Sequence, residues 1–219
     1  MNTKNPMRGL LSYMFQAASG NLLLTLLTSL ALAAALLLTG IAFFHSFFVM
    51  AAIAGAPYII MASMGGKKSH KWERFQISMP IRRSDLVNAL YLCIFAASLV
   101  GIPLVVIVTS LYYVLHESIF EHTLTTVLID SSALFFSLPL LMAGLLFPLA
   151  CTKAGENRGE ALFTLCLLPA VANSLFMPML AERLGFPKYT LALLPLAVAL
   201  LVFVVSYFIT RRIYAKLDF

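Results

Sequence analysis

Charged residues are missing from a long stretch near the amino terminus, and this absence constrains the fold more than any other feature. From Gly9 to Gly66 the chain contains no Lys, Arg, Asp or Glu. Of all 219 residues, 61% are hydrophobic and 11% are charged, whereas soluble domains have about 45–50% apolar and about 25% charged residues. The sequence therefore predicts a membrane protein. The net charge of +6 needs no nucleic-acid partner, because cytoplasmic loops of membrane proteins collect Lys and Arg.

Six apolar segments are long enough to cross a bilayer. A hydrocarbon core about 30 Å thick requires about 20 apolar residues per helix, and continuous runs of this length favour helices over a barrel. The uncharged stretch is twice as long as one span, so we expect it to turn near Gly40 and the His45-Ser46 pair as a helical hairpin. The expected all-α fold is a single transmembrane domain, 1–219, with spans at about 22–44, 47–64, 89–113, 127–150, 161–180 and 189–210.

The basic residues predict the orientation in the membrane. With a cytoplasmic amino terminus, every one of the 15 Lys and Arg residues except Arg183 and Lys188 falls on a cytoplasmic segment. Positive charge is concentrated on the cytoplasmic side of membrane proteins, so we expect both termini to be cytoplasmic. The first apolar stretch is much longer than the 7–15 residues of a signal-peptide core, and we interpret it as retained.

Residues 6–20 have the pattern of an amphipathic helix. Apolar side chains recur there at helical spacing, at Met7, Leu10, Leu11, Met14, Phe15 and Ala18. An amphipathic helix beside a span is typical of an interfacial segment that lies on the inner leaflet, and Gly20-Asn21 would end it. The alternative is a first span that simply starts early.

Signatures of nucleotide binding and of catalysis are weak. The segment Gly65–Ser69 has a Gly-Lys pair, but a phosphate-binding loop also needs a glycine where Met61 stands and Ser or Thr where Lys68 stands. We therefore expect no cofactor in this chain by that route. His116-Glu117 and Glu121-His122 form two short polar pairs without the spacing of a zinc-protease motif. A weak metal site is the less favoured interpretation and a solvated external loop the more favoured one, so we expect no catalytic residue and no metal ligand.

The polar residues inside the spans offer one candidate for a transport pathway. Asp130 lies near the external end of the fourth span, and charged groups inside a membrane are usually functional. Ser131 and Ser132 follow it, so Asp130 is either a pathway residue or a helix cap at the interface. Asn173 is more simply interpreted as an interhelical hydrogen-bond partner. The scarcity of acidic residues within the spans argues against a proton-driven or sodium-driven carrier.

A basic segment, 65–85, separates the second and third spans. Within it, Trp72, Phe75 and Met79 share one helical face, whereas Glu73 and Arg74 point elsewhere and are available to a partner. Pro80 ends this short cytoplasmic helix, residues 68–79. We expect Ser84 to cap the next helix, with Asp85 in its first turn. The alternative is a basic loop held to anionic lipid.

This segment resembles a known family. Trp72-Glu73-Arg74-Phe75, followed by Ser78 to Val87, is similar to the corresponding segment of ABC-2-type permeases, which are bacterial exporter subunits with six spans and cytoplasmic termini. The sharp part of the resemblance covers residues 71–87, and the rest of the chain agrees more loosely. Within the family the chain is most similar to small permeases that include the exporters of phenol-soluble modulins.

The resemblance implies a half-transporter in the bacterial cell membrane, paired with a second copy or a sister permease. Two separate ATPase subunits would bind ATP and Mg²⁺ and dock on a coupling helix at 68–79. The implied contacts are Lys71, Trp72, Glu73, Arg74, Phe75, Ile77 and Met79, with a possible second contact at Lys153, Glu156 and Arg158. The implied function is export of amphipathic or hydrophobic peptides. Export of lipid or drugs, expulsion of an antimicrobial peptide, and a small channel or secondary carrier are the alternatives.

Overall fold

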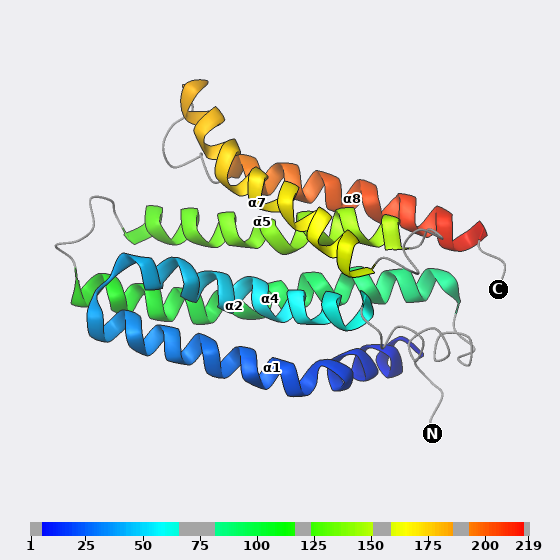
Figure 1. Ribbon diagram of the computed structural model, residues 1–219, viewed down its shortest axis with the longest axis horizontal. Helices are drawn as coiled ribbons and strands as arrows, with labels where there is room; N and C mark the ends of the chain where they lie inside the picture. Colours follow the sequence, from blue (N-terminus) through cyan, green and yellow to red (C-terminus); the bar gives the residue numbers. More distant parts are fainter. Residues whose placement is uncertain (1–5, 66–81, 117–123, 151–158, 186–192, 217–219) are drawn as a thin grey trace.

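The computed structural model describes residues 6–65, 82–116, 124–150, 159–185 and 193–216. All regular elements in these ranges are α-helices, which confirms the predicted all-α class. They are α1 (Pro6–Thr39), α2 (Ala42–Gly65), α4 (Arg83–Leu115), α5 (Leu124–Ala150), α7 (Gly159–Arg183) and α8 (Leu193–Lys216), shown in Figure 1.

Five helices of the described chain are long and apolar enough to cross a membrane. Their apolar spans are Asn21–Thr39, Phe43–Met61, Ser84–Leu115, Val127–Leu149 and Leu193–Lys216. The apolar part of α7 is shorter, Thr164–Leu180, and at 1.5 Å per residue it extends over about 26 Å, less than the ~30 Å core. The predicted span at 161–180 is therefore not confirmed as a full span.

Successive helices run in alternate directions along the bundle. The starts of α1, α4 and α7 and the ends of α2, α5 and α8 lie together at the right of Figure 1. We call this the basic end, because Arg82 at the start of α4 and Arg211 and Arg212 near the end of α8 lie there. The opposite end, with the turn between α1 and α2, is the hairpin end, and Arg183 lies at that end of α7. This separation of basic residues agrees with the expected topology.

The first helix is longer than the sequence predicts. α1 has 34 residues and runs through Gly20 and Asn21 without a break. A separate interfacial helix over 6–20 is therefore not confirmed. The alternative of a first span that starts early is not confirmed either, because the apolar span begins at Asn21 and α1 bends in its amino-terminal part (Figure 1). One glycine inside a helix costs only about 1 kcal/mol relative to alanine, and no proline interrupts α1 after Pro6.

The turn between α1 and α2 lies at Gly40 and not at the His45-Ser46 pair, which is inside α2. Gly40 has φ +67° and its N–H donates to the Leu36 carbonyl at 2.9 Å. Glycine adopts this left-handed conformation without steric cost, so it ends the helix. The predicted boundary at residues 44–47 is thus wrong, because nothing prevents His45 and Ser46 from being helical.

The end of α4 holds this turn in place. The Tyr112 hydroxyl donates to the Gly40 carbonyl at 2.9 Å, and the His45 ring stacks on Tyr112 with a centroid distance of 5.8 Å. A Cβ on Gly40 would lie 2.8 Å from the His116 ring. The α1–α2 hairpin is therefore packed against α4 at the hairpin end.

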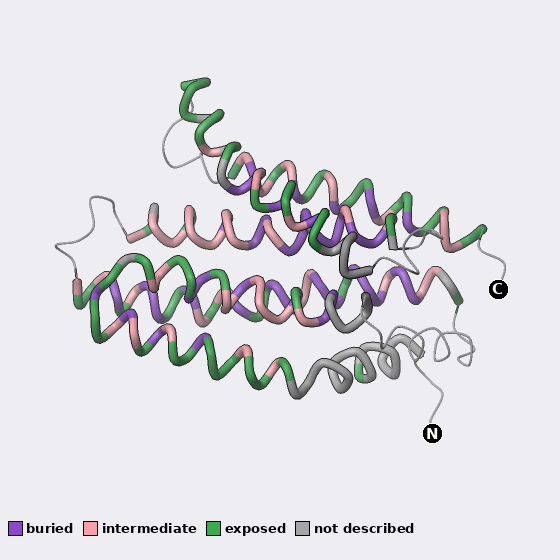
Figure 2. The backbone as a smooth tube through the Cα atoms, viewed as in Figure 1, coloured by how far each residue is buried: buried purple, intermediate pink, exposed green. Residues whose placement is uncertain are grey.

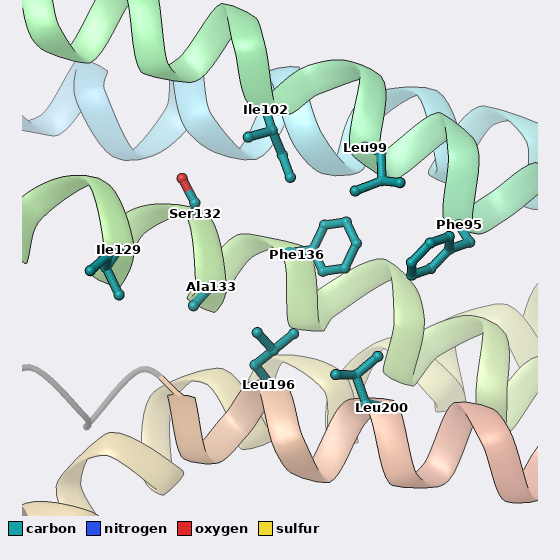
Figure 3. Close-up of a pocket in the computed structure, with 9 residues that line it drawn as sticks. All are labelled: Phe95, Leu99, Ile102, Ile129, Ser132, Ala133, Phe136, Leu196 and Leu200. Atoms are coloured by element: carbon teal, nitrogen blue, oxygen red, sulfur yellow. The ribbon is translucent and has the colours of Figure 1, made fainter. Parts of the chain in front are cut away.

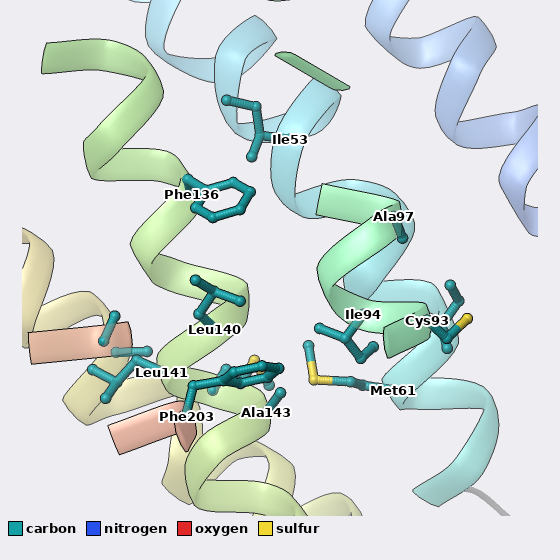
Figure 4. Close-up of a cluster of buried hydrophobic side chains, with 14 of the residues drawn as sticks. Ile53, Met61, Cys93, Ile94, Ala97, Phe136, Leu140, Leu141, Ala143 and Phe203 are labelled. Carbon is teal, nitrogen blue, oxygen red and sulfur yellow. The ribbon is translucent and has the colours of Figure 1, made fainter. Parts of the chain in front are cut away.

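Helix α5 forms the centre of the bundle, packed against α2, α4, α7 and α8. In its apolar span 61% of residues are buried inside the protein, compared with 17% in α1, as Figure 2 illustrates. Figure 4 shows Phe136 and Leu140 of α5 among buried side chains of α2, α4 and α8, including Ile53, Ile94 and Phe203. The core is therefore built around α5.

Glycine residues bring helix backbones into direct contact. A Cβ on Gly101 of α4 would lie 2.6 Å from the carbonyl carbon of Ala52 and 2.8 Å from the Cα of Ile53 in α2. At Gly144 of α5 the nearest backbone atom, the Cα of Phe203 in α8, would lie at 3.2 Å. Small residues at such crossings allow the close van der Waals packing that holds helices together in lipid.

We predict that Gly101→Ala destabilises the protein, because a backbone cannot move aside as a side chain can. The expected loss is about 1–3 kcal/mol of unfolding free energy, the usual cost of overpacking, and Gly144→Ala should cost less. Thermal unfolding in detergent measures both. Val100→Ala, at a neighbouring position that is 74% exposed, is the control. Equal melting temperatures for Gly101→Ala and the unchanged protein would contradict the close packing of α2 and α4.

Candidate functional site: an apolar groove and the borders of the coupling segment

The predicted coupling helix, 68–79, lies outside the described residues. The same holds for its proposed contact residues, Lys71, Trp72, Glu73, Arg74, Phe75, Ile77 and Met79, and for the second set, Lys153, Glu156 and Arg158. The helices that border both segments are described. The end of α2 and the start of α4, and likewise the end of α5 and the start of α7, lie at the basic end (Figure 1).

α4 starts two residues earlier than predicted. The N-cap is Arg82, in extended conformation with φ −65° and ψ 137°, and no side-chain hydrogen bond caps the helix. Ser84 is therefore already inside α4 and is not the cap. Asp85 lies in the first turn as predicted, with its N–H donating to the Arg82 carbonyl at 2.9 Å. A carboxylate in this position interacts favourably with the helix dipole.

Asp130 does not cap a helix. α5 begins at Leu124, so Asp130 follows the first turn and lies inside the span Val127–Leu149. Its side chain is half-buried. The cap interpretation is wrong because the residues from Leu124 to Ile129 already continue the helix towards the hairpin end.

Asn173 joins two helices, as the sequence predicts. It is buried in α7 and its Nδ2 donates to the carbonyl of Pro195 in α8 at 3.2 Å. Next to it, the hydroxyls of Ser174 in α7 and Ser137 in α5 lie 3.4 Å apart. These polar contacts hold α7 against α5 and α8.

The histidines at the hairpin end do not form a metal site in the described residues. His116 is half-buried and its Nε2 donates to the Leu37 carbonyl of α1 at 3.3 Å. No group of three or more His, Cys, Asp or Glu side chains suited to a metal occurs in the part of the chain that the structure describes. Glu117, Glu121 and His122 lie outside it. His116 therefore packs against the hairpin, contrary to the favoured interpretation of a solvated loop.

An apolar groove of about 360 Å³ lies between α4, α5 and α8. Figure 3 shows its lining from all three helices. The lining residues are Phe95, Leu99 and Ile102 of α4, Ile129, Ser132, Ala133 and Phe136 of α5, and Leu196 and Leu200 of α8. Ser132 alone has a polar side chain. The groove can therefore bind apolar groups, and it offers no charge to a hydrophilic solute.

The sequence does not reveal this groove. Its residues come from three segments that are far apart in the chain, and every one lies in an apolar span. In such spans a side chain that faces lipid and one that lines a groove have the same composition. The serine pair at 131–132 is the one local polar signal, and by itself it predicts part of a helix cap.

Comparison with known proteins identifies the family. A family model described as ABC-2 family transporter protein matches residues 14–215, so the chain belongs to the ABC-2 transporter family. No curated protein and no solved structure was found to match it. The protein is thus a multi-pass membrane subunit of an ABC transporter, and ATP hydrolysis takes place in a partner ATPase.

Proposed function

We propose that this chain is the permease subunit of an exporter that moves amphipathic or hydrophobic peptides out of the cell. Family membership supports ATP-driven transport with a separate ATPase, which would bind ATP and Mg²⁺. The direction, the peptide substrate and the pairing with a second permease are parts of the proposal. Both termini and the basic end would face the cytoplasm, because positive charge collects on that side.

The groove between α4, α5 and α8 is the observation that carries the peptide assignment. Its volume of about 360 Å³ falls within the usual range for ligand sites, about 300–1,000 Å³. On α4 the lining extends from Phe95 to Ile102 and on α5 from Ile129 to Phe136, about 10 Å along each helix. The apolar face of an amphipathic helix repeats over the same two turns, so the groove fits such a face.

The motor would act at the basic end. An ATPase that grips the coupling segment through Trp72, Glu73, Arg74 and Phe75 would move the end of α2 and the start of α4, which border this segment. Closure of the ATPase pair on ATP would then alternate the side on which the groove opens. The segment with Lys153, Glu156 and Arg158 would make a smaller contact between α5 and α7.

We predict that Ser132→Leu weakens the response to peptide, because the larger side chain fills the groove. The peptide concentration that half-stimulates ATP hydrolysis by the reconstituted complex should rise about tenfold, since burial of one Leu-sized group is worth ~1.5 kcal/mol or more. Ser131→Leu is the matched control. It is the same substitution on the same helix, but Ser131 does not line the groove. Equal effects of the two variants would contradict the groove as peptide site.

The same assay separates the substrate classes. A panel of amphipathic peptides, phospholipids and apolar drugs is added to the complex in liposomes, and ATP hydrolysis is measured. Peptides should stimulate it most. Stimulation by lipid or drug without stimulation by peptides would make the peptide assignment wrong and favour the lipid or drug exporter.

We predict that Glu73→Ala combined with Arg74→Ala removes the ATPase subunit from the purified complex. The variant would lose two charged groups that contact the ATPase in this proposal, and a few residues carry most of the binding free energy of a protein interface. Co-purification of the tagged permease with its ATPase measures this. Arg211→Ala with Arg212→Ala, an exposed pair at the same end, controls for general loss of charge. Unchanged binding by the Glu73/Arg74 variant would refute the coupling-helix assignment.

We predict that Asp130→Asn still exports peptide, because transport takes its energy from ATP in this proposal. Depletion of ATP should stop export in both the variant and the unchanged protein. Peptide efflux from loaded vesicles measures both. A secondary carrier would show the reverse, with export lost in Asp130→Asn and retained without ATP.

A further inference from the structure

Three buried hydroxyl groups join α4 to α8 near the basic end. The Tyr91 hydroxyl of α4 lies 2.6 Å from the Ser206 Oγ and 2.9 Å from the Thr210 Oγ1 of α8. Ser206 and Thr210 are four residues apart, so they lie on one face of α8. Tyr91 is 4% exposed, and the two α8 residues are also buried. The three groups therefore satisfy one another away from solvent.

A further hydrogen bond lies beside these two contacts, with its tyrosine on α8. The Tyr207 hydroxyl of α8 donates to the Asn88 Oδ1 of α4 at 2.7 Å. Asn88 and Tyr91 are three residues apart on α4 and thus share a face. The two tyrosine rings meet edge to face, with centroids 5.5 Å apart. Each helix thus contributes one tyrosine that bonds to the other helix.

Aromatic contacts fix the Tyr91 ring. It packs against Phe147 of α5 with centroids 5.0 Å apart and against Phe203 of α8 at 4.9 Å. Such ring pairs are geometrically specific. The hydroxyl of Tyr91 is thereby held in position for its two partners on α8.

The position of these bonds is what makes them informative. Tyr91 lies about 12 Å along α4 from Arg83, close to the segment that links α2 and α4. On α8 the bonded residues directly precede Arg211 and Arg212. α8 packs most extensively on α5, so the hydroxyl bonds are a specific link between α8 and the helix that follows the coupling segment.

We propose that Asn88 and Tyr91 of α4, with Ser206, Tyr207 and Thr210 of α8, form a hydroxyl latch that makes α8 follow α4 when the ATPase moves the coupling segment. The latch residues are positioning residues, since they act through the helices they join. α8 also lines the groove, with Leu196 and Leu200. Movement at the basic end would thus reach both walls of the groove together. This inference rests on the proposed docking of the ATPase before α4.

Hydroxyl groups suit this purpose better than apolar contacts. A buried hydroxyl that leaves its partner loses a hydrogen bond that lipid cannot replace, and this loss adds to the loss of apolar packing. Two helices joined by several such bonds have a preferred register. α4 and α8 would therefore move as one body at the basic end.

The test uses the full complex of permease and ATPase in liposomes. Tyr91→Phe keeps the ring contacts and removes the latch hydroxyl, and Tyr207→Phe does the same for the second bond. We expect ATP hydrolysis to continue while peptide exported per ATP falls about threefold in Tyr207→Phe, which corresponds to about 0.6 kcal/mol, the average worth of an interhelical hydrogen bond in a membrane. In Tyr91→Phe, which loses two such bonds, it should fall about eightfold.

The matched control is Tyr112→Phe. It also removes a buried tyrosine hydroxyl from α4, but at the hairpin end, where the hydroxyl donates to Gly40. Peptide exported per ATP should stay unchanged in this variant. Ser206→Ala with Thr210→Val should lower the ratio as Tyr91→Phe does, and adding Tyr91→Phe should lower it no further, because the same bonds are already lost.

A distance measurement keeps the latch separate from the proposed function. Spin labels on Arg82→Cys and Arg212→Cys, both at exposed positions, report the separation of α4 and α8 in a background without the three native cysteines. With ATP present, the distribution of distances should be broader in Tyr91→Phe combined with Tyr207→Phe than with an intact latch. An unchanged distribution, an unchanged export ratio, or an equal loss in Tyr112→Phe would overturn the latch. If the unchanged protein does not bind an ATPase subunit, or if peptides do not stimulate ATP hydrolysis by its complex, the proposed function is wrong instead.

Discussion

Within a bilayer, helices gain no free energy by hiding apolar side chains from lipid, so their association depends on close packing and on hydrogen bonds between them. The contact of Gly101 with the backbone of α2 meets this requirement most directly. Because the backbones of α2 and α4 are in contact at Gly101, the end of α4 lies close enough to the α1–α2 hairpin for Tyr112 to bond to Gly40. α5 then fills the space beside α2 and α4 and supports α7 and α8. The arrangement of the groove follows from this order of packing.

Polar contacts are concentrated towards the two ends of α4. At the hairpin end, Tyr112 and His116 bond to the backbone of the α1–α2 hairpin. Towards the basic end, Asn88 and Tyr91 bond to α8. Most of the intervening turns of α4 are apolar, and they include the groove wall. α4 therefore forms hydrogen bonds with the α1–α2 hairpin at one end and with α8 at the other. The groove proposed to bind substrate lies between these two sets of bonds.

The sequence predicts the features of this fold that depend on the composition of a single segment. Runs of about 20 apolar residues identify helices, and the placement of Lys and Arg predicts the alternation of the bundle. The predicted break at Gly20-Asn21 is not confirmed and the one at His45-Ser46 is wrong, because residues that permit a break do not require one. Gly40 does require the turn, since its φ is positive and the His116 ring fills the space where a Cβ would lie.

The candidate site was less accessible to prediction. Asn173 was interpreted correctly because a lone amide in a span needs a partner, and Pro195 supplies it. Nothing in the sequence distinguishes Tyr91, Ser206 and Thr210, because hydroxyls are common in membrane helices and only the tertiary structure pairs them. The coupling segment was recognised by resemblance, and residues 66–81 lie outside the described ranges. The groove is formed by side chains of three helices, and no pattern within one segment of the sequence predicts such an arrangement.

The length of α1 has a consequence for how the protein sits in its bilayer. Its 34 residues measure about 51 Å along the helix axis. A straight helix of this length would have to lean by roughly 54° to fit wholly within a hydrocarbon layer of ~30 Å, more than the 0–40° found for membrane helices. Its first turns must therefore reach the phospholipid headgroups at the basic end. Because α1 bends between its amino-terminal part and the span that leads to the Gly40 turn (Figure 1), the amino-terminal part can follow the headgroup layer while the span keeps its own tilt.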